Sequence, residues 1–446
     1  MLSRIRIRNF RCLRDVSLDL QPLTFIVGPN GSGKSSILLA LQLLKQSIDK
    51  GITFDGEFVE LGSFQDVLYS GAGVSDVLFG DRSWVSLQVD VKLSKTELDI
   101  ISPLLNNPLI PSEVSRPEEV GYEASFNGTQ IMQSYLVNNQ KIFTFGLVEM
   151  GTKSYGWMIR LPSRLKNVDC SGADRILCPD AISINYRGTD IPKEDITSFL
   201  HILRLISTII RKQIESTYYI SVLRQPTIMV TGPGYFPRWV GRKGEHTVGL
   251  LGLIFGSREY ELARERIIEW ARAFGLDELR AGWRGRQELS ADFKDPKTHT
   301  TQKITAAGYG SVQILPIITQ LFWSPVNSTI SFEEPEISLH LELLSKLPTM
   351  FSEVVNEGKQ LIITTHEQNI LFALKPVIAK KELSHEKVAL YELQRSEEGS
   401  TAQKLELTPE GAIKGGISSF IEAQRHMIYQ WTLTVPPANE GKHSDA

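Results

Sequence analysis

The chain has 446 residues, of which 41% are hydrophobic and 22% are charged. This composition is ordinary for a globular protein and excludes wholesale disorder, a collagen-like repeat and a disulfide-dense miniprotein. The length predicts two or three domains, or one large domain with insertions. The chain has 48 lysines and arginines and 51 aspartates and glutamates, so its net charge is −3. No global field therefore draws the chain to nucleic acid or anionic lipid, and any such contact needs a local patch.

The cysteines and the apolar runs indicate where the protein works. Cys12, Cys170 and Cys178 are odd in number and have no metal-ligand spacing, which favours a reducing compartment. The N-terminus lacks the apolar core of a secretory signal. The best apolar runs, such as residues 314–322, are shorter than the roughly 20 residues that a membrane span needs. We therefore expect a soluble, cytoplasmic protein without a membrane partner.

The first fifty residues predict strands, a glycine loop and a helix, in that order. Residues 4–10 and 16–20 alternate apolar and polar side chains, which favours strands. Residues 23–27, Leu-Thr-Phe-Ile-Val, form a short, mainly apolar run, as buried central strands tend to be. The glycine-rich stretch 28–33 follows, and apolar residues recur at helical spacing from Lys34 onward.

The rest of the chain predicts a mixed insertion and then a return to alternating α and β structure. Residues 52–93 look rich in strands, and alternation near 130–145 and 155–161 indicates a β-rich insertion. The other expected elements, with the same periodicities, are helices at 196–214, 258–274, 312–322 and 338–355, strands at 218–223, 328–332, 360–364 and 388–393, and a Gly/Pro-rich loop at 225–247. The polar last dozen residues predict a loose tail.

Residues 28–35, Gly-Pro-Asn-Gly-Ser-Gly-Lys-Ser, fit the phosphate-loop pattern GxxxxGK[ST]. Its glycines let backbone N–H groups turn toward phosphate oxygens, and the start of the following helix adds partial positive charge. A chance glycine-rich turn is the alternative, but the loop follows an apolar strand and opens a helix, as the motif demands. The predicted cofactors are ATP and Mg²⁺, and the predicted binding residues are Asn30, Gly31, Ser32, Gly33, Lys34, Ser35 and Ser36. Lys34 would reach the β- and γ-phosphates, and Ser35 would ligate Mg²⁺.

Two glutamates follow the strand predicted at 328–332. A buried strand that ends in acids is costly unless the acids hold a cation or have a chemical role. We expect Glu333 to hold Mg²⁺ through water and Glu334 to take a proton from the attacking water. An acidic helix N-terminus is the alternative, because Pro335 and Glu336 also suit a first helical turn.

His366 follows the strand predicted at 360–364. A histidine at this position can sense a γ-phosphate by hydrogen bonding, so His366 joins Glu334 as a predicted catalytic residue. The alternative interpretation is that His366 is an ordinary hydrogen-bonded polar residue at a strand end. The place of His366, one predicted strand after the acidic pair, favours the functional role.

These three elements, in this order, resemble ATP-binding-cassette (ABC) ATPases of the RecF and structural-maintenance-of-chromosomes (SMC) type. The resemblance begins at residues 5–10, Ile-Arg-Ile-Arg-Asn-Phe. Residues 333–340, Glu-Glu-Pro-Glu-Ile-Ser-Leu-His, are similar to the DEPExHLHP segment of the prokaryotic AAA-family group that includes overcoming-lysogenisation-defect (OLD) ATPases. Residues 61–64 and 240–245 also resemble that group. The match covers residues 1–90 and 215–425.

The chain departs from the family's pattern at several positions. Glu333 stands where most of these ATPases carry Asp, and Ser338 and Leu341 replace the first His and the Pro of the HLHP segment. Gln65 and Gln88 are both candidates for the Q-loop residue of the family, and the sequence does not choose between them.

The resemblance implies that a signature loop from one subunit caps the ATP of another. The equivalent here is the stretch 307–316, in which Gly308 and Gly310 leave room for a γ-phosphate. The helix that begins near Ser311 points its N-terminus there. A plain helix-entry turn is the alternative, because the usual Ser-Gly-Gly order is missing. The implied assembly is a homodimer or a higher homo-oligomer.

The predicted fold class is α/β: an ABC-type P-loop ATPase domain split in sequence by a mixed β/α insertion. We expect residues 1–93 and 301–425 to form the two halves of this domain. Residues 94–300 would form the insertion, first β-rich and then helical, and residues 426–446 a tail.

The expected activity is slow ATP hydrolysis that switches a head-to-tail dimer, because each site needs a partner subunit to be complete. No intrinsic nuclease is predicted, since the residues after His366 lack a run of paired acids suited to two metals. By resemblance, the expected partner is a separately encoded effector such as a nuclease, in anti-phage defence of the Septu type. Two alternatives stay open: a DNA-repair or recombination ATPase that binds DNA directly, and a nucleotide-binding scaffold with little turnover.

Basic side chains supply the candidate nucleic-acid contacts. They gather at the N-terminus and around the Gly/Pro-rich loop, with aromatic residues interleaved: Arg4, Arg6, Arg8, Arg11 and Arg14, then Arg224, Arg238, Arg242 and Lys243 with Tyr235, Phe236 and Trp239. Phosphate pairing and base stacking would make such a region a nucleic-acid surface. A solvated face, or a loop that packs near the nucleotide, is the alternative.

Overall fold

The computed structural model describes most of the chain: residues 1–68, 84–111, 114, 116–127, 130–150, 154–160, 168–171, 176–177, 183–186, 192–225, 237–284 and 288–434. Parts of two expected segments lie outside these residues. They are the last dozen residues, expected to form a tail, and residues 226–236 of the Gly/Pro-rich loop, with Tyr235 and Phe236. Cys178 lies outside them as well.

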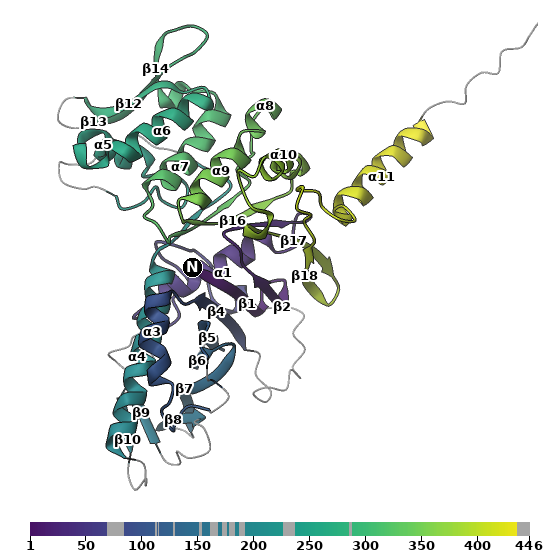
Figure 1. Ribbon diagram of the computed structural model, residues 1–446. Helices are drawn as coiled ribbons and strands as arrows, with labels where there is room; N and C mark the ends of the chain where they lie inside the picture. The colour runs from purple at the N-terminus through teal and green to yellow at the C-terminus, as the bar shows by residue number, and fades with distance from the viewer. Residues whose placement is uncertain are drawn as a thin grey trace, which may run out of the picture.

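One thirteen-stranded sheet runs through the molecule (Figure 1). Its parallel part has the order β11 (Thr217–Ile220), β15 (Thr329–Glu333), β16 (Gln360–Thr365), β3 (Leu23–Val27) and β17 (Val388–Ser396). The sheet continues, mostly antiparallel, through β18 (Gly399–Leu405), β2 (Leu13–Asp19), β1 (Leu2–Phe10), β4 (Val85–Lys92), β5 (Glu119–Phe126), β6 (Ile131–Val137), β7 (Gln140–Met150) and β8 (Ser154–Arg160).

Helices cover both faces of the parallel strands, and this explains why residues 23–27 are apolar except for Thr24. Ile26 packs into the hydrophobic core that contains α1 (Lys34–Ser47) and α4 (Lys193–Glu215). Phe25, on the opposite face of the sheet, packs into the core formed with α5 (Thr247–Gly256), α6 (Glu261–Ala273), α7 (Tyr309–Trp323), α9 (Leu347–Asn356) and α10 (Gln368–Ala379). The structure thus confirms the predicted α/β class.

The remaining elements lie at two ends of the molecule. Figure 1 shows β5–β8 beside α4 and α3 (Lys95–Leu104) at one end, and α5 and α6 with β12 (Asp277–Arg284), β13 (Glu288–Lys294) and β14 (Thr301–Lys303) at the other. The strands β9 (Val168–Ser171) and β10 (Ser183–Tyr186) form a separate pair. An insertion of mixed strand and helix therefore separates the two parts of the core in sequence, as predicted.

Two elements cross the predicted domain boundaries. The strand β11 falls inside the segment 94–300, yet it pairs in parallel with β15 in the core sheet. The strands β5–β8 are joined to the core through β4 without a break in the sheet. The division at residues 93, 300 and 425 remains a prediction, and α11 (Ser418–Thr434) runs across the last of these boundaries.

Other differences from the predicted elements have local causes. The helix expected at 338–355 is two helices, α8 (Leu341–Leu344) and α9, because Pro348 lacks an N–H and suits the first turn of a new helix. Among the described residues of the stretch 52–93, β4 is the only strand, and Phe64–Val67 form the short helix α2.

Candidate functional site

The phosphate loop connects the C-terminal end of β3 to the start of α1, and its glycines are required by geometry. Gly28, Gly31 and Gly33 have φ angles of 147°, 75° and 99°. A Cβ on Gly28 would lie 2.4 Å from the carbonyl oxygen of Leu393, and a Cβ on Gly33 would lie 2.7 Å from the sulfur of Cys12. Backbone conformation and space both exclude larger residues here.

We expect Gly33→Ala to lower the free energy of unfolding by about 1–3 kcal/mol, because it combines backbone strain with overlap against Cys12. Gly256→Ala is the matched control, since a Cβ there would meet nothing within 4 Å. The control should change the free energy of unfolding by less than about 0.5 kcal/mol. Chemical denaturation measures both variants, and equal stabilities would contradict the steric argument.

Lys34 lies folded against the loop. Its side chain is buried, and its Nζ donates to the carbonyl oxygens of Gly28 and Pro29 at 2.7 and 3.0 Å. Burial lowers the pKa of Lys34, while the nearby carboxylates of Glu334 and Glu333 act in the opposite direction. An ammonium group among inward-turned backbone groups at a helix start is the arrangement that binds nucleotide phosphates.

Ser35 and Glu333 meet beside the loop. The Ser35 hydroxyl donates to Glu333 Oε2 at 2.9 Å, and the Tyr219 hydroxyl donates to Glu333 Oε1 at 2.6 Å. Glu333 is 6% exposed, and this burial raises its pKa, whereas the hydrogen bonds from Tyr219 and Ser35 lower it. A hydroxyl and a carboxylate are the oxygen ligands that Mg²⁺ prefers. The two predicted metal residues therefore fit a magnesium ion.

Glu334 and His366 lie side by side at the ends of β15 and β16. The distance between Glu334 Oε1 and His366 Nδ1 is 3.1 Å, and the two side chains are 20% and 49% exposed. Glu334 has a φ of 43°, a left-handed conformation that costs a non-glycine residue about 1–3 kcal/mol. Its N–H donates to the carbonyl oxygen of Thr364 at 2.8 Å. Such stored strain is typical of functional residues.

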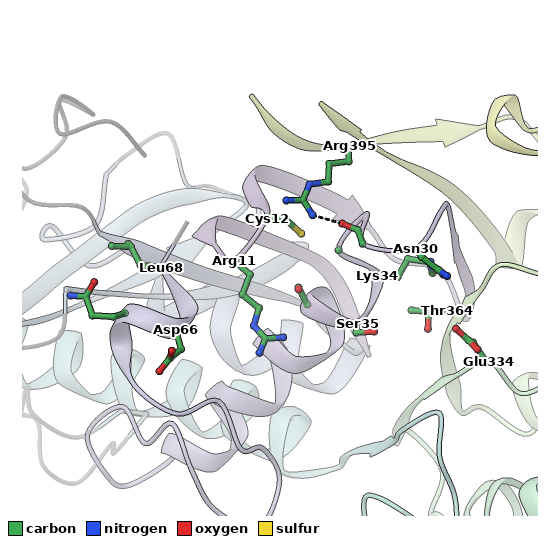
Figure 2. A pocket seen from close by; sticks show the side chains of 14 residues that line it. Arg11, Cys12, Asn30, Lys34, Ser35, Asp66, Leu68, Glu334, Thr364 and Arg395 are labelled. Atoms are coloured by element: carbon green, nitrogen blue, oxygen red, sulfur yellow. Dashed lines mark hydrogen bonds between the residues drawn. The ribbon is translucent and has the colours of Figure 1, made fainter. Parts of the chain in front are cut away.

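A cavity of about 620 Å³ lies beside the phosphate loop (Figure 2). This volume is in the range of small-molecule sites. The predicted residues that line it are Asn30, Gly31, Gly33, Lys34, Ser35, Ser36 and Glu334. Ser32, Glu333 and His366 do not line the cavity. Ser32 lies within the phosphate loop, Glu333 is hydrogen-bonded to Ser35, and His366 contacts Glu334.

The cavity is also lined by residues that the sequence did not predict as nucleotide contacts: Arg11, Cys12, Asp66, Leu68, Thr364 and Arg395. Gln65 also lines it, whereas Gln88 is buried and donates to Asp90. Gln65 is therefore the Q-loop candidate that lies at the site. Arg395 Nη1 donates to the carbonyl oxygen of Gly31 at 2.9 Å (Figure 2). The signal for Arg395 is its place near the C-terminal end of β17, the strand that pairs with β3.

The candidate signature residues lie at the start of α7, away from this cavity. A Cβ on Gly310 would lie 2.4 Å from the carbonyl oxygen of Ser338, while a Cβ on Gly308 would meet nothing within 4 Å. The hydroxyl of Ser311 donates to the carbonyl oxygen of Phe274 at 2.9 Å. Their expected role concerns the nucleotide of a partner subunit, so it stays a prediction.

Several arginines of the candidate basic patches have acidic partners. Arg4 pairs with Asp19 at 2.8 Å, Arg6 with Asp15 at 2.8 Å and Arg242 with Glu60 at 2.6 Å. Arg224 is fully buried. These pairings neutralise part of the positive charge on which direct DNA binding would depend.

The described residues contain neither a cluster of metal-ligating side chains nor a membrane-spanning helix. No three His, Cys, Asp or Glu side chains gather there in a way that could hold a metal ion. In the same part of the chain, no helix is both long and apolar enough to cross a bilayer.

The phosphate loop between β3 and α1, with acidic and polar residues at the ends of the adjacent parallel strands, defines a P-loop ATPase site. Consistent with this class, the family model for an AAA ATPase domain matches residues 1–100 and 259–371. The matched residues are similar to an AAA ATPase domain, and the gap in the match falls within the insertion.

Individual proteins with similarity to the chain cover it in different ways. A stretch of 44 residues is 59% identical to the OLD nuclease of Thermus scotoductus and covers 10% of this chain and 8% of that protein. The SMC head domain of Thermotoga maritima covers 91% of this chain and 99% of its own, with 12% identity and a TM-score of 0.41. An SMC head bound to the C-terminal winged-helix domain of ScpA covers 91% and 98%, with 13% identity and a TM-score of 0.49.

Proposed function

We propose that the chain hydrolyses Mg-ATP in a head-to-tail dimer, and that closing and reopening of this dimer control a separately encoded effector such as a nuclease, in anti-phage defence. The observation that carries the proposal is that Lys34, Ser35 and Glu334 line one cavity, with Glu333 hydrogen-bonded to Ser35 beside it. The short similarity to an OLD nuclease supports a nuclease-linked setting.

Each residue has a defined part in this proposal. The loop backbone and Lys34 bind the phosphates, while Ser35 and Glu333 would hold Mg²⁺, which neutralises phosphate charge when bound. Glu334 takes the proton of the attacking water. His366 contacts Glu334 through Nδ1, and we assign its Nε2 to a hydrogen bond with the γ-phosphate.

The exposure of the site supports a partner subunit. His366 is half exposed, and Gly308 borders open space. Tyr309 and Leu341, at the starts of α7 and α8, are large apolar side chains that are also exposed. A second copy that covers these residues would bury apolar surface and exclude water from the nucleotide.

Light scattering tests the switch. We expect the Glu334→Gln protein to double in mass when Mg-ATP is added, because slow hydrolysis preserves the closed state. EDTA should reverse the change, and Lys34→Met should not respond to nucleotide. A mass that does not depend on nucleotide in any variant would contradict the switch and favour the scaffold alternative. Salt-sensitive DNA binding that strengthens with ATP would instead favour the repair alternative.

A further inference from the structure

Arg224 lies just beyond β11 and is buried against the backbone of Glu333 and Glu334, which we call the catalytic segment. Its side chain is 0% exposed. Its Nη1 donates to the carbonyl oxygen of Glu333 at 2.7 Å, and its Nη2 donates to that of Glu334 at 2.9 Å. The guanidinium thus binds the backbone carbonyls of Glu333 and Glu334, the two acidic residues of the proposed hydrolysis.

The same side chain also binds α7. Arg224 Nε donates to the carbonyl oxygen of Gln313 at 2.8 Å, and the Arg224 N–H donates to Gln313 Oε1 at 3.0 Å. Gln313 Nε2 donates in return to the Arg224 carbonyl oxygen. Gln313 is buried and lies one turn beyond Gly310. Arg224 therefore connects the catalytic segment to the helix whose first turn holds the candidate signature residues.

The arrangement suits arginine and no other residue. Burial lowers the pKa of Arg224 to about 10, so the group keeps its charge at neutral pH. A buried charge is costly unless it is hydrogen-bonded, and the planar fork of arginine can reach several acceptors at fixed angles. A lysine has a single ammonium at that position and cannot hold the Glu333, Glu334 and Gln313 carbonyls together.

We propose that Arg224 is a positioning residue for hydrolysis, which holds the left-handed backbone of Glu334 in place and couples it to α7. The inference rests on the proposed function and deepens it. If the start of α7 contacts the nucleotide of a partner, that contact reaches Glu334 of the same chain through Gln313 and Arg224. The two sites of a dimer would then not act independently.

The experiment compares three single variants and one double variant of the whole chain. Arg224→Lys and Gln313→Met alter the connection, and Lys359→Met is the matched control. Lys359 is also a buried cation bound to α7, since its Nζ donates to the Leu321 carbonyl oxygen at 2.8 Å. The measurements are phosphate release at saturating Mg-ATP, affinity for a fluorescent ATP analogue, and thermal unfolding.

We expect kcat to fall about 10- to 100-fold in Arg224→Lys and in Gln313→Met, with nucleotide affinity within about threefold of wild type. Lys359→Met should lower thermal stability without lowering kcat. The double variant should lose less than the product of the two single losses, because both changes break one connection.

Three outcomes would overturn the inference. If folded Arg224→Lys and Gln313→Met both keep kcat within about threefold of wild type, Glu334 does not need the connection. If Arg224→Lys fails to fold, an unchanged kcat in Gln313→Met has the same meaning. If Lys359→Met lowers kcat as strongly, the effect is general loss of stability. Absence of turnover in the wild type would instead overturn the proposed hydrolysis itself.

Discussion

The Glu334→Gln variant is expected to release phosphate at least about 100-fold more slowly than wild type at saturating Mg-ATP. The carboxylate of Glu334 lines the cavity beside His366, and an amide of the same shape cannot accept the proton of water. Nucleotide affinity should stay within about threefold, because the phosphates are held by the loop and Lys34. Single-turnover phosphate release and equilibrium titration measure the two quantities.

A matched control for this variant is Glu382→Gln. Glu382 is an exposed residue just after α10, and its substitution should leave turnover unchanged. Persistence of wild-type turnover in Glu334→Gln would mean that another group accepts the proton, and the assignment of Glu334 as the base would be wrong. A loss of nucleotide binding equal to the loss of turnover would also contradict it, since it would indicate a binding role.

The Lys34→Met variant is expected to bind ATP at least about tenfold more weakly than wild type, because it loses charge-assisted hydrogen bonds of about 1.5–3 kcal/mol to the phosphates. Methionine retains the volume of the stem, which is buried against the loop. Calorimetric titration with a slowly hydrolysed ATP analogue measures the affinity, and ADP titration separates β- from γ-phosphate contributions.

Lys50→Met serves as the control for that measurement, because Lys50 is exposed just after α1. It removes the same charge from the same region of sequence and should not change the affinity by more than about twofold. Equal affinities of Lys34→Met and wild type would mean that Lys34 stays bound to the carbonyls of Gly28 and Pro29 when nucleotide is present.

Local patterns were sufficient to predict the parallel core and the center of the site. The apolar run 23–27 and the loop that follows it specify strand, turn and helix within a few residues. Glu334 and His366 end two strands that lie next to each other in the sheet, so their contact follows once both strands are recognised. The confirmed fold class depends on the same signals.

Contacts from distant segments could not be predicted in this way. Tyr219 reaches Glu333 because β11 pairs with β15, and no periodicity reveals which strands become neighbours. Arg224 likewise has no signal that distinguishes it from a surface arginine. Arg395 lies over the phosphate loop only because β17 is the neighbour of β3. Strand order in a sheet is set by tertiary packing, which local sequence does not encode.

The helix expected at 338–355 illustrates a different limit. Its apolar spacing is helical throughout, but Pro348 begins a second helix and Ser338 has a φ of 61°. The break lets the segment turn back past Gly310, whose Cα lies against the Ser338 carbonyl oxygen. The spacing of apolar residues predicts which face of a helix is buried, but it does not predict where the helix axis changes direction.

The continuity of the thirteen-stranded sheet has a mechanical consequence. Hydrogen-bonded strands cannot slide without breaking their ladder, so β2, β1 and β4–β8 form one stiff sheet. This sheet meets the nucleotide-binding strands at a single paired position, Ser400 with Leu13, between β18 and β2. At about 4.8 Å per strand, the six spacings from β2 to β8 give an arm of roughly 30 Å. A rotation of the sheet about that junction by about 10° would sweep the edge strand β8 through roughly 5 Å, the product of arm and angle. The sheet of the insertion would therefore act as a lever. A small rotation near the nucleotide would give a larger displacement at β8.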